Sequence, residues 1–156
     1  MPQNIEPPEA DSPNASIGSH VDPSPPGAPV VLPPDASLVM RVMPMPADTN
    51  MSGGVFGGWI MAQVDIAGSV LPAKIARGRI TTVAVNRFMF KQPVSVGDLL
   101  SFYARVERIG TTSITVHVEV YAERNPANPH IVKVTEASLT YVAIDATGKP
   151  RPVPKG

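Results

Sequence analysis

The most regular hydrophobic pattern in the chain lies at residues 113–121, where apolar and polar residues alternate. Ile114, Val116, Val118 and Val120 occupy one set of positions, and mostly polar residues fill the positions between them. A period of two predicts an antiparallel strand with one buried face. Runs rich in Val, Ile, Thr and aromatic residues predict four further strands. These cover residues 37–43, 79–90, 99–108 and 131–145.

A helical pattern lies between the first two predicted strands, in DTNMSGGVFGGWIMAQVDIAGSVLPAKI (residues 48–75). Its polar and glycine-rich beginning predicts a turn, and its second half has apolar residues on almost every face. A helix that is apolar nearly all round is expected to be buried. Pro72 predicts a kink or break near Leu71, with a short second piece at residues 73–77. Gly78 is expected to cap the C-terminus of the helix.

One charge, Asp65, interrupts the apolar part of this helix before the expected break near Leu71. A lone buried carboxylate is costly unless it is paired or takes part in chemistry. The glycines allow a ligand to approach the backbone, and the first amides of a helix have no partners within it. Such amides bind an anion or polarise a carbonyl oxygen. Asp65 lies roughly 10–12 Å along the axis from Gly57, so one substrate could contact both ends of this segment.

The order of elements is a strand, a buried helix and then four strands joined by short turns. This order predicts an α+β fold in which one antiparallel sheet wraps around the helix. A single five-stranded sheet covers only one side of a helix. The other side and the sheet edge are therefore expected to require a second subunit, which predicts at least a dimer.

The two ends of the chain differ in composition from its centre. Residues 1–35 contain ten of the 19 prolines and few large apolar residues before Val30. Such a segment cannot bury enough apolar surface to offset the entropy lost on ordering. We therefore predict a disordered, Pro-rich tail at residues 1–36, one domain at 37–146 and a polar tail at 147–156.

Composition and charge narrow the functional classes. The chain has 156 residues, 43% of them hydrophobic, and a formal net charge of zero. This balance argues against nucleic acid or an acidic membrane surface as the main partner. The absence of cysteine excludes disulfides, a cysteine nucleophile and thiolate metal sites, and the three histidines are too dispersed to predict a metal site. Without an apolar run of about 20 residues or a signal peptide, the expectation is a cytoplasmic protein without membrane spans.

Several short stretches resemble one enzyme family, in order and with family-like spacing from residue 39 to residue 154. They are MPADTN (45–50), FGGWIMAQVDIAG (56–68), GRITTVAV (78–85), Phe90 with PVSVGD (93–98), GTTSI (110–114), TEASLTYVAID (135–145) and GKPRPVP (148–154). The chain resembles the hot-dog fold acyl-CoA thioesterases of the bacterial, YciA-like branch. FGGW followed by IM, Q, D and G is the most specific part of the pattern, whereas PVSVGD alone would be weak.

The resemblance implies a hot-dog fold and an enzyme that cleaves acyl-CoA to a free carboxylic acid and coenzyme A, without a cofactor or a metal. It implies that Asp65 acts as general base or nucleophile, a choice the sequence leaves open. It implies that Asn50 lies across the same site and is contributed by a different hot-dog unit. It also implies that the backbone amide of Gly57, with Gly58 as its neighbour, polarises the thioester carbonyl. It also implies dimers that assemble further, often as trimers of dimers, hence a homohexamer.

We further expect coenzyme A contacts at a turn and at two basic residues. These are Gly110, Thr111, Thr112 and Ser113 in the turn, with Lys91 and Arg151 for the phosphates. Simpler interpretations stay open for all of them, namely a hairpin turn and solvated charges. Asp65 could also be a hydrogen-bonded structural carboxylate, Asn50 a turn residue, and the two helix glycines a place of close packing.

Two rival functions follow from the same fold. A hot-dog hydratase or dehydratase usually carries a histidine with an acid at its site, and no histidine lies between His20 and His117. A non-catalytic acyl-CoA sensor would keep the fold without the chemistry, and the presence of Asp65 together with Asn50 argues against it. The length of the preferred acyl chain cannot be obtained from the residues alone.

Overall fold

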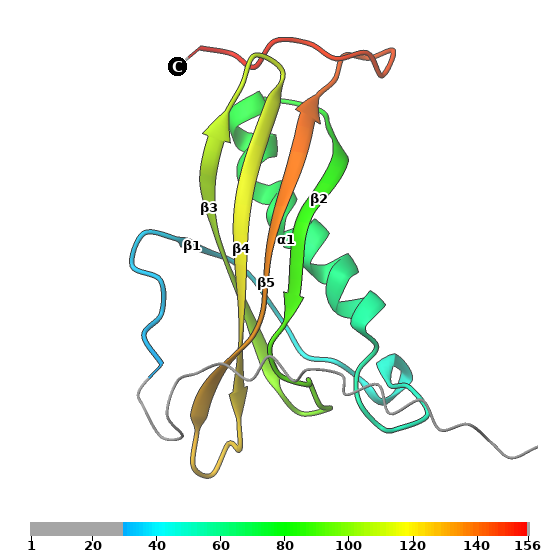
Figure 1. Cartoon of the computed structure of the whole chain (residues 1–156), viewed down its shortest axis with the longest axis vertical. Helices are drawn as coiled ribbons and strands as arrows, with labels where there is room; N and C mark the ends of the chain where they lie inside the picture. The colour runs from blue at the N-terminus through cyan, green and yellow to red at the C-terminus, as the bar shows by residue number, and fades with distance from the viewer. Residues whose placement is uncertain (1–29, 156) are drawn as a thin grey trace, which may run out of the picture.

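The computed structural model describes residues 30–155, which form one antiparallel sheet and one long helix (Figure 1). The strand order is β1-β3-β4-β5-β2, and every neighbouring pair is antiparallel. The helix lies across one face of the sheet, so the predicted five-stranded sheet with a single helix is confirmed. The elements are β1 (Ser37–Val42), the 3-10 helix η1 (Pro46–Asp48), α1 (Gly57–Ala76), β2 (Ile80–Phe90), β3 (Leu99–Ile109), β4 (Ser113–Arg124) and β5 (His130–Ala143).

The alternating strand β4 lies in the middle of the sheet and forms the centre of the core. The side chains of Ile114, Val116, Val118 and Val120 are completely buried, as the period-two pattern predicts. The strand runs three residues beyond its predicted end, and its pairing with β5 continues to Arg124 past a register shift between Val120 and Tyr121.

Helix α1 buries one face rather than its whole circumference. The buried residues that face the sheet recur every four positions at Ile60, Val64, Gly68, Pro72 and Ala76, and Ala67 lies beside Gly68. Met61 and Ile66, on the other side, are 41% and 54% exposed. The expectation of a helix buried all round is therefore wrong for the single chain. One sheet covers only one side of a helix, so the second apolar face stays open.

Two expectations for the end of α1 are also wrong. The helix runs without a break through Pro72, whose side chain is buried in the core, so that tertiary packing outweighs the local preference. The left-handed residue at the C-terminus is Arg77, with φ 49°, and not Gly78. Gly78 instead leaves room for the guanidinium of Arg151, because a Cβ atom there would lie 2.8 Å from its Nη2 atom.

Residues 147–153, predicted as a polar tail outside the domain, run back along the top of the sheet (red in Figure 1). The amide of Val153 donates to the carbonyl of Thr111 at 2.8 Å, and the Val153 side chain belongs to the hydrophobic core. Residues 1–29 of the predicted N-terminal tail lie outside the part of the chain that the structure describes. Among the described residues, no helix is long and apolar enough to cross a membrane.

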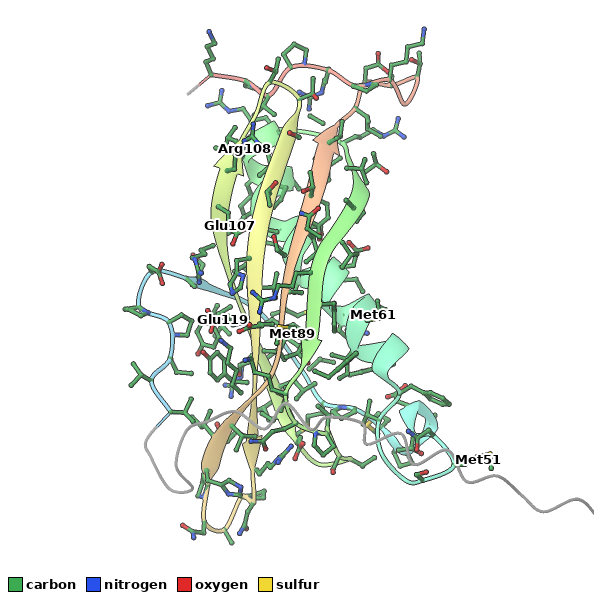
Figure 2. All side chains as sticks on the ribbon, in the orientation of Figure 1. Met51, Met61, Met89, Glu107, Arg108 and Glu119 are labelled. Atoms are coloured by element: carbon green, nitrogen blue, oxygen red, sulfur yellow. The ribbon has the colours of Figure 1, made fainter. Side chains whose placement is uncertain are left out.

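The sheet face opposite the helix carries a cluster of charged side chains centred on Glu119 (Figure 2). Glu119 is 8% exposed, and it accepts hydrogen bonds from Tyr121 at 2.6 Å and Arg105 at 3.1 Å, with the Lys133 ammonium at 2.8 Å. Burial alone would raise the pKa of Glu119. The bonds from Lys133, Tyr121 and Arg105 outweigh burial and lower that pKa from its ordinary 4.5 to about 2.

The depressed pKa of Glu119 predicts a loss of stability in acid. A carboxylate whose pKa is lower in the folded state stabilises the fold above its unfolded pKa, and this contribution disappears as the pH falls from 4.5 to about 2. It is worth on the order of 3 kcal/mol. We expect Glu119→Gln to be less stable at pH 7 and to show a shallower decline between pH 5 and 2, measured by urea unfolding. A variant with the decline of the parent would contradict the assignment.

Candidate functional site

Asp65 lies on α1 at the side of the sheet where β2 forms the edge. Its Oδ1 atom accepts hydrogen bonds from the hydroxyl of Thr82 at 2.8 Å and from the hydroxyl of Tyr141 at 3.1 Å. Its Oδ2 atom accepts none from the residues that the structure describes. The residue is partly buried rather than fully buried as the apolar pattern of the helix predicts. One oxygen is held in place while the other remains available to a ligand.

Tyr141 is the buried group that connects Asp65 to the sheet. It is 1% exposed, and its hydroxyl also donates to the backbone carbonyl of Asp65 at 2.8 Å. Burial first, and then the charge and hydrogen bond of Asp65, raise the pKa of Tyr141 far above its ordinary value. Tyr141 therefore remains a protonated donor, and the carboxylate cannot turn away without losing it.

Gly68 makes this contact possible. A Cβ atom at Gly68 would lie 2.6 Å from the hydroxyl of Tyr141 and 3.3 Å from a methyl group of Val118. Only a residue without a side chain lets the helix come this close to the sheet. No role for Tyr141 or Thr82 follows from the sequence, although both lie in stretches that carry the family resemblance. Their positions opposite Asp65 come from the sheet register.

The turn before α1 is held by backbone hydrogen bonds. The amide of Asn50 donates to the carbonyl of Gly54 at 2.8 Å, and Gly53 donates back to Asn50 at 3.0 Å with φ +82°. The side-chain Oδ1 of Asn50 accepts from the amide of Ser52 at 2.9 Å. Asn50 thus builds the turn, as the simpler interpretation expects, while its Nδ2 group donates to no described residue and is free to meet a ligand.

The first amides of α1 point out of the helix. The carbonyl of Phe56 accepts from the amides of Trp59 and Ile60 at 3.1 and 3.2 Å. Within the described part of the chain, the amides of Gly57 and Gly58 have no acceptor, as expected for the first turn of a helix. They are positioned to bind a negatively charged or polarised oxygen.

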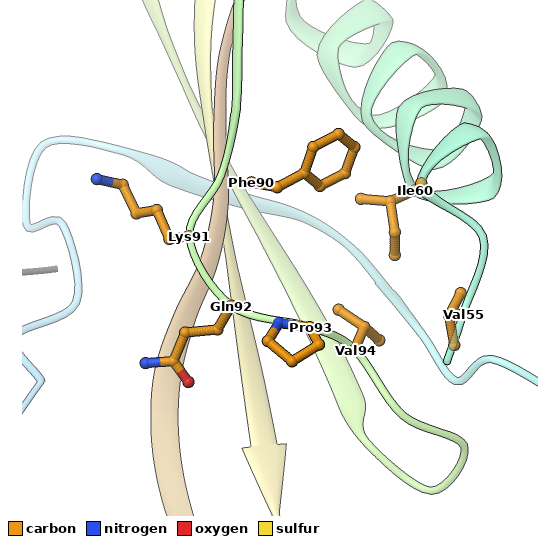
Figure 3. Close-up of a pocket in the computed structure, with 8 residues that line it drawn as sticks. Val55, Ile60, Phe90, Lys91, Gln92, Pro93 and Val94 are labelled. Carbon is orange, nitrogen blue, oxygen red and sulfur yellow. The ribbon is translucent and has the colours of Figure 1, made fainter. Parts of the chain in front are cut away.

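A pocket of about 370 Å³ opens beside Gly57, between the start of α1 and the segment after β2 (Figure 3). Lys91 and Gln92 line it, but their side chains point away from it. The Lys91 ammonium lies 3.6 Å from Glu136, and Gln92 accepts a hydrogen bond from Arg124 at 3.4 Å. The lining residues are Val55, Gly57, Ile60, Phe90, Lys91, Gln92, Pro93 and Val94.

The other predicted site residues lie at the opposite end of α1. The β3–β4 turn is bonded to the C-terminal segment, with the carbonyl of Thr111 accepting from the amide of Val153 at 2.8 Å. Arg151 donates to the carbonyl of Ala76 at 2.7 Å and so caps the helix C-terminus. A helix of 20 residues is about 30 Å long. One chain therefore does not bring Gly110, Thr111, Thr112, Ser113 and Arg151 to the amides of Gly57 and Gly58.

The arrangement suits acyl transfer. A carboxylate with one free oxygen can take up the proton of a water molecule or attack a carbonyl carbon. Unpaired amides at a helix N-terminus can stabilise the negative charge that then develops on the carbonyl oxygen. The described residues hold no group of three His, Cys, Asp or Glu side chains placed to bind a metal ion.

Comparison with known proteins places this geometry in a family. The thioesterase superfamily matches residues 52–127. The acyl-CoA thioester hydrolase YciA of Salmonella typhimurium is 48% identical over 123 residues, which cover 78% of this chain and 92% of that protein. The crystal structure of a hexameric thioesterase from Yersinia pestis superposes with a TM-score of 0.74 at 46% identity, covering 79% of this chain and 99% of that one. A hexameric hot-dog fold thioesterase of Campylobacter jejuni superposes with a TM-score of 0.72 at 38% identity, covering 75% and 90%.

The contact between Gly68 and Tyr141 predicts opposite results for two glycines of the same helix. Gly68→Ala should lower the free energy of unfolding by about 1–3 kcal/mol because its new methyl group overlaps the Tyr141 hydroxyl. Gly58→Ala is the control, since a Cβ there meets nothing within 4 Å. It should leave stability unchanged or raise it slightly through helix propensity. Urea unfolding of both variants makes the comparison, and equal losses would refute the close contact.

Proposed function

The chain belongs to the thioesterase superfamily, among the YciA-type acyl-CoA thioester hydrolases, and from this we propose that it hydrolyses acyl-CoA to a free carboxylic acid and coenzyme A. The observation that carries the proposal is the placement of Asp65 on the helix whose first amides are unpaired. The names of the relatives support the substrate class, and the free Oδ2 atom of Asp65 supports the reaction type.

In the proposed mechanism the amide of Gly57, with Gly58 beside it, donates to the thioester carbonyl oxygen. Asp65 either removes a proton from water as the water attacks the carbonyl carbon, or attacks that carbon itself to form an anhydride that water then opens. In both cases the carbon–sulfur bond breaks and coenzyme A leaves as a thiolate. A thiol pKa of about 8.5 makes this leaving group good enough without a strong acid. Thr82 and Tyr141 hold Oδ1 of Asp65, so Oδ2 faces the substrate.

The proposal includes a second chain in each site. Strand β2 is an 11-residue edge strand with Val83 and Val85 54% and 47% exposed, beside the open apolar side of α1. Two β2 edges that pair antiparallel would cover both surfaces. Antiparallel pairing sets the helix start of one chain beside the helix end of the other. It would bring the β3–β4 turn and Arg151 of one chain toward Gly57 of the next, and Asn50 would serve its neighbour's Asp65.

Further assembly into a trimer of such dimers is part of the proposal. The structural relatives from Yersinia pestis and Campylobacter jejuni are hexamers. A closed assembly of identical dimers is a common route to a hexamer. The scheme needs no cofactor, because coenzyme A enters as part of the substrate and leaves as product.

The first test is removal of the Asp65 charge. Asp65→Asn keeps the size of the side chain but cannot accept a proton from water or form an anhydride, so kcat should fall by about 10²–10⁴-fold. Thiol release is measured with acetyl-, butyryl- and palmitoyl-CoA. The control is Asp35→Asn, whose carboxylate is exposed and pairs with Arg105 on the far face of the sheet. Near-normal turnover in Asp65→Asn would remove this residue from the mechanism.

The same assay separates the enzyme from a sensor. A parent protein that binds every acyl-CoA but releases thiol from none would favour an acyl-CoA-binding module. Binding of free coenzyme A by Asp65→Asn should remain, because the proposed role of the carboxylate is confined to the chemical step.

The shared site predicts recovery of activity when two inactive variants are mixed. Asn50→Ala and Asp65→Asn are each expected to be poorly active. If the two residues of one site come from different chains, a mixed dimer contains one intact site and one doubly damaged site. Random reassembly after unfolding should then restore about a quarter of the parent activity. Recovery no greater than the sum of the two separate variants would place both residues of a site in one chain.

A further inference from the structure

The pocket beside Gly57 has apolar walls although two of its residues are polar. Lys91 and Gln92 contribute backbone, and their side chains are bonded to Glu136 and Arg124 outside the pocket (Figure 3). The remaining side chains, Val55, Ile60, Phe90, Pro93 and Val94, are hydrocarbon. The volume of about 370 Å³ exceeds twice that of a protein cavity of about 150 Å³ that binds benzene. The space therefore suits an apolar group of several carbons.

Most of these walls are fixed. The amide of Val55 donates to the carbonyl of Val94 at 3.0 Å and joins the turn before α1 to the segment after β2. Ile60 and Val94 are 1% and 5% exposed and belong to the core. A side chain packed on all sides cannot move to admit a larger ligand without disturbing the core.

Phe90 and Pro93 are the two exposed side chains of the lining, and Phe90 is the one that lies against Gly57. Its side chain is 50% exposed, and its ring leans on Gly57, where a Cβ atom would lie only 3.0 Å from the ring atom Cζ. The ring also packs against that of Phe88, with the ring centres 4.9 Å apart. The ring thus covers the Cα side of Gly57 while half of it remains open to solvent, so this wall of the pocket can change without disturbing the core.

We propose that this pocket receives the acyl chain of the substrate and that Phe90 limits the length of chain it accepts. The inference rests on the thioesterase function proposed above. From a thioester carbonyl bound by the amide of Gly57, the substrate extends in two directions, as the acyl chain and as the pantetheine arm of coenzyme A. The pantetheine arm carries two amide groups that need hydrogen-bond partners, and the polar side chains of the pocket residues are bonded elsewhere. The hydrocarbon arm needs none, and it enters the pocket.

Phe90 therefore acts as a specificity-determining residue, and it takes no part in bond breaking. Each methylene group that the pocket buries should raise kcat/KM by about fourfold, until the chain reaches the ring. Beyond that length the ring must move aside, and further carbons should bring little gain. The position of the ring should therefore determine the chain length at which kcat/KM stops rising, which we call the break.

The experiment compares Phe90→Ala and Phe90→Leu with the parent on acetyl-, butyryl-, hexanoyl-, octanoyl- and palmitoyl-CoA. Phe90→Ala should move the break to longer chains and raise the ratio of kcat/KM for octanoyl- over butyryl-CoA by about tenfold, the equivalent of one to two more buried methylenes. Phe90→Leu should lie between the two. Inhibition by free coenzyme A should not change, because the pocket does not hold that arm. Both substitutions are at a half-exposed position and leave the core intact.

The matched control is Phe56→Ala. Phe56 is also half-exposed, at 53%, and precedes the same helix, but it does not line the pocket. Its loss should leave the ranking of the substrates as in the parent. An equal shift of the ranking in Phe56→Ala would overturn the assignment to Phe90. A uniform change across all chain lengths in Phe90→Ala, with weaker inhibition by coenzyme A, would assign the pocket to the coenzyme A arm instead.

A binding measurement separates the pocket from the chemistry. Dissociation constants of the same acyl-CoA series are measured by calorimetry in Asp65→Asn and in Asp65→Asn with Phe90→Ala. If the chain length at which affinity stops rising increases with Phe90→Ala, the acyl pocket is supported. This holds even if the parent releases no thiol, a result that would refute only the hydrolysis. Affinities that do not depend on chain length in either protein would overturn the acyl pocket and leave hydrolysis standing.

Discussion

The hydroxyl of Tyr141 determines how the helix lies on the sheet. It donates to the backbone of Asp65 and to its carboxylate, and it reaches both only because Gly68 has no side chain. This contact joins packing and chemistry, since the close approach that completes the core also orients the proposed catalytic group. The carboxylate is held by one oxygen, and a group held in one orientation needs no reorganisation when the substrate reacts.

The helix and the edge strand beside it leave apolar surface exposed on the single chain. One side of α1 fills the core, whereas Met61 and Ile66 on the other side remain exposed. The long edge strand β2 lies beside them with its own exposed valines. The residues expected at the active site are likewise separated, because the free amides lie at one end of α1 and Arg151 at the other. The proposed second copy of the chain would cover the apolar surface, pair with the open edge and bring the separated site residues together.

The two faces of the sheet perform different tasks. The face under α1 is hydrocarbon and provides the burial on which folding depends. The opposite face carries Glu119 with the cations of Arg105 and Lys133, and these ion pairs keep the carboxylate charged although it is buried. Lys91, expected from the sequence at a phosphate of coenzyme A, pairs with Glu136 on this face. A charge with a protein partner is less available to a ligand.

The sequence alone determined the architecture, because the period of two in β4 and the glycine-rich start of an apolar helix are local patterns that chain geometry converts directly into elements. It also identified Asp65 as the one acidic side chain inside that helix. The sequence could not place Tyr141 or Thr82 against Asp65, since residues 76 and 17 positions away meet it only through the sheet register. The buried course of Pro72 and the return of Val153 to the core were likewise decided by long-range packing. Only the tertiary structure fixes such contacts, because their free energy comes from partners distant in the chain.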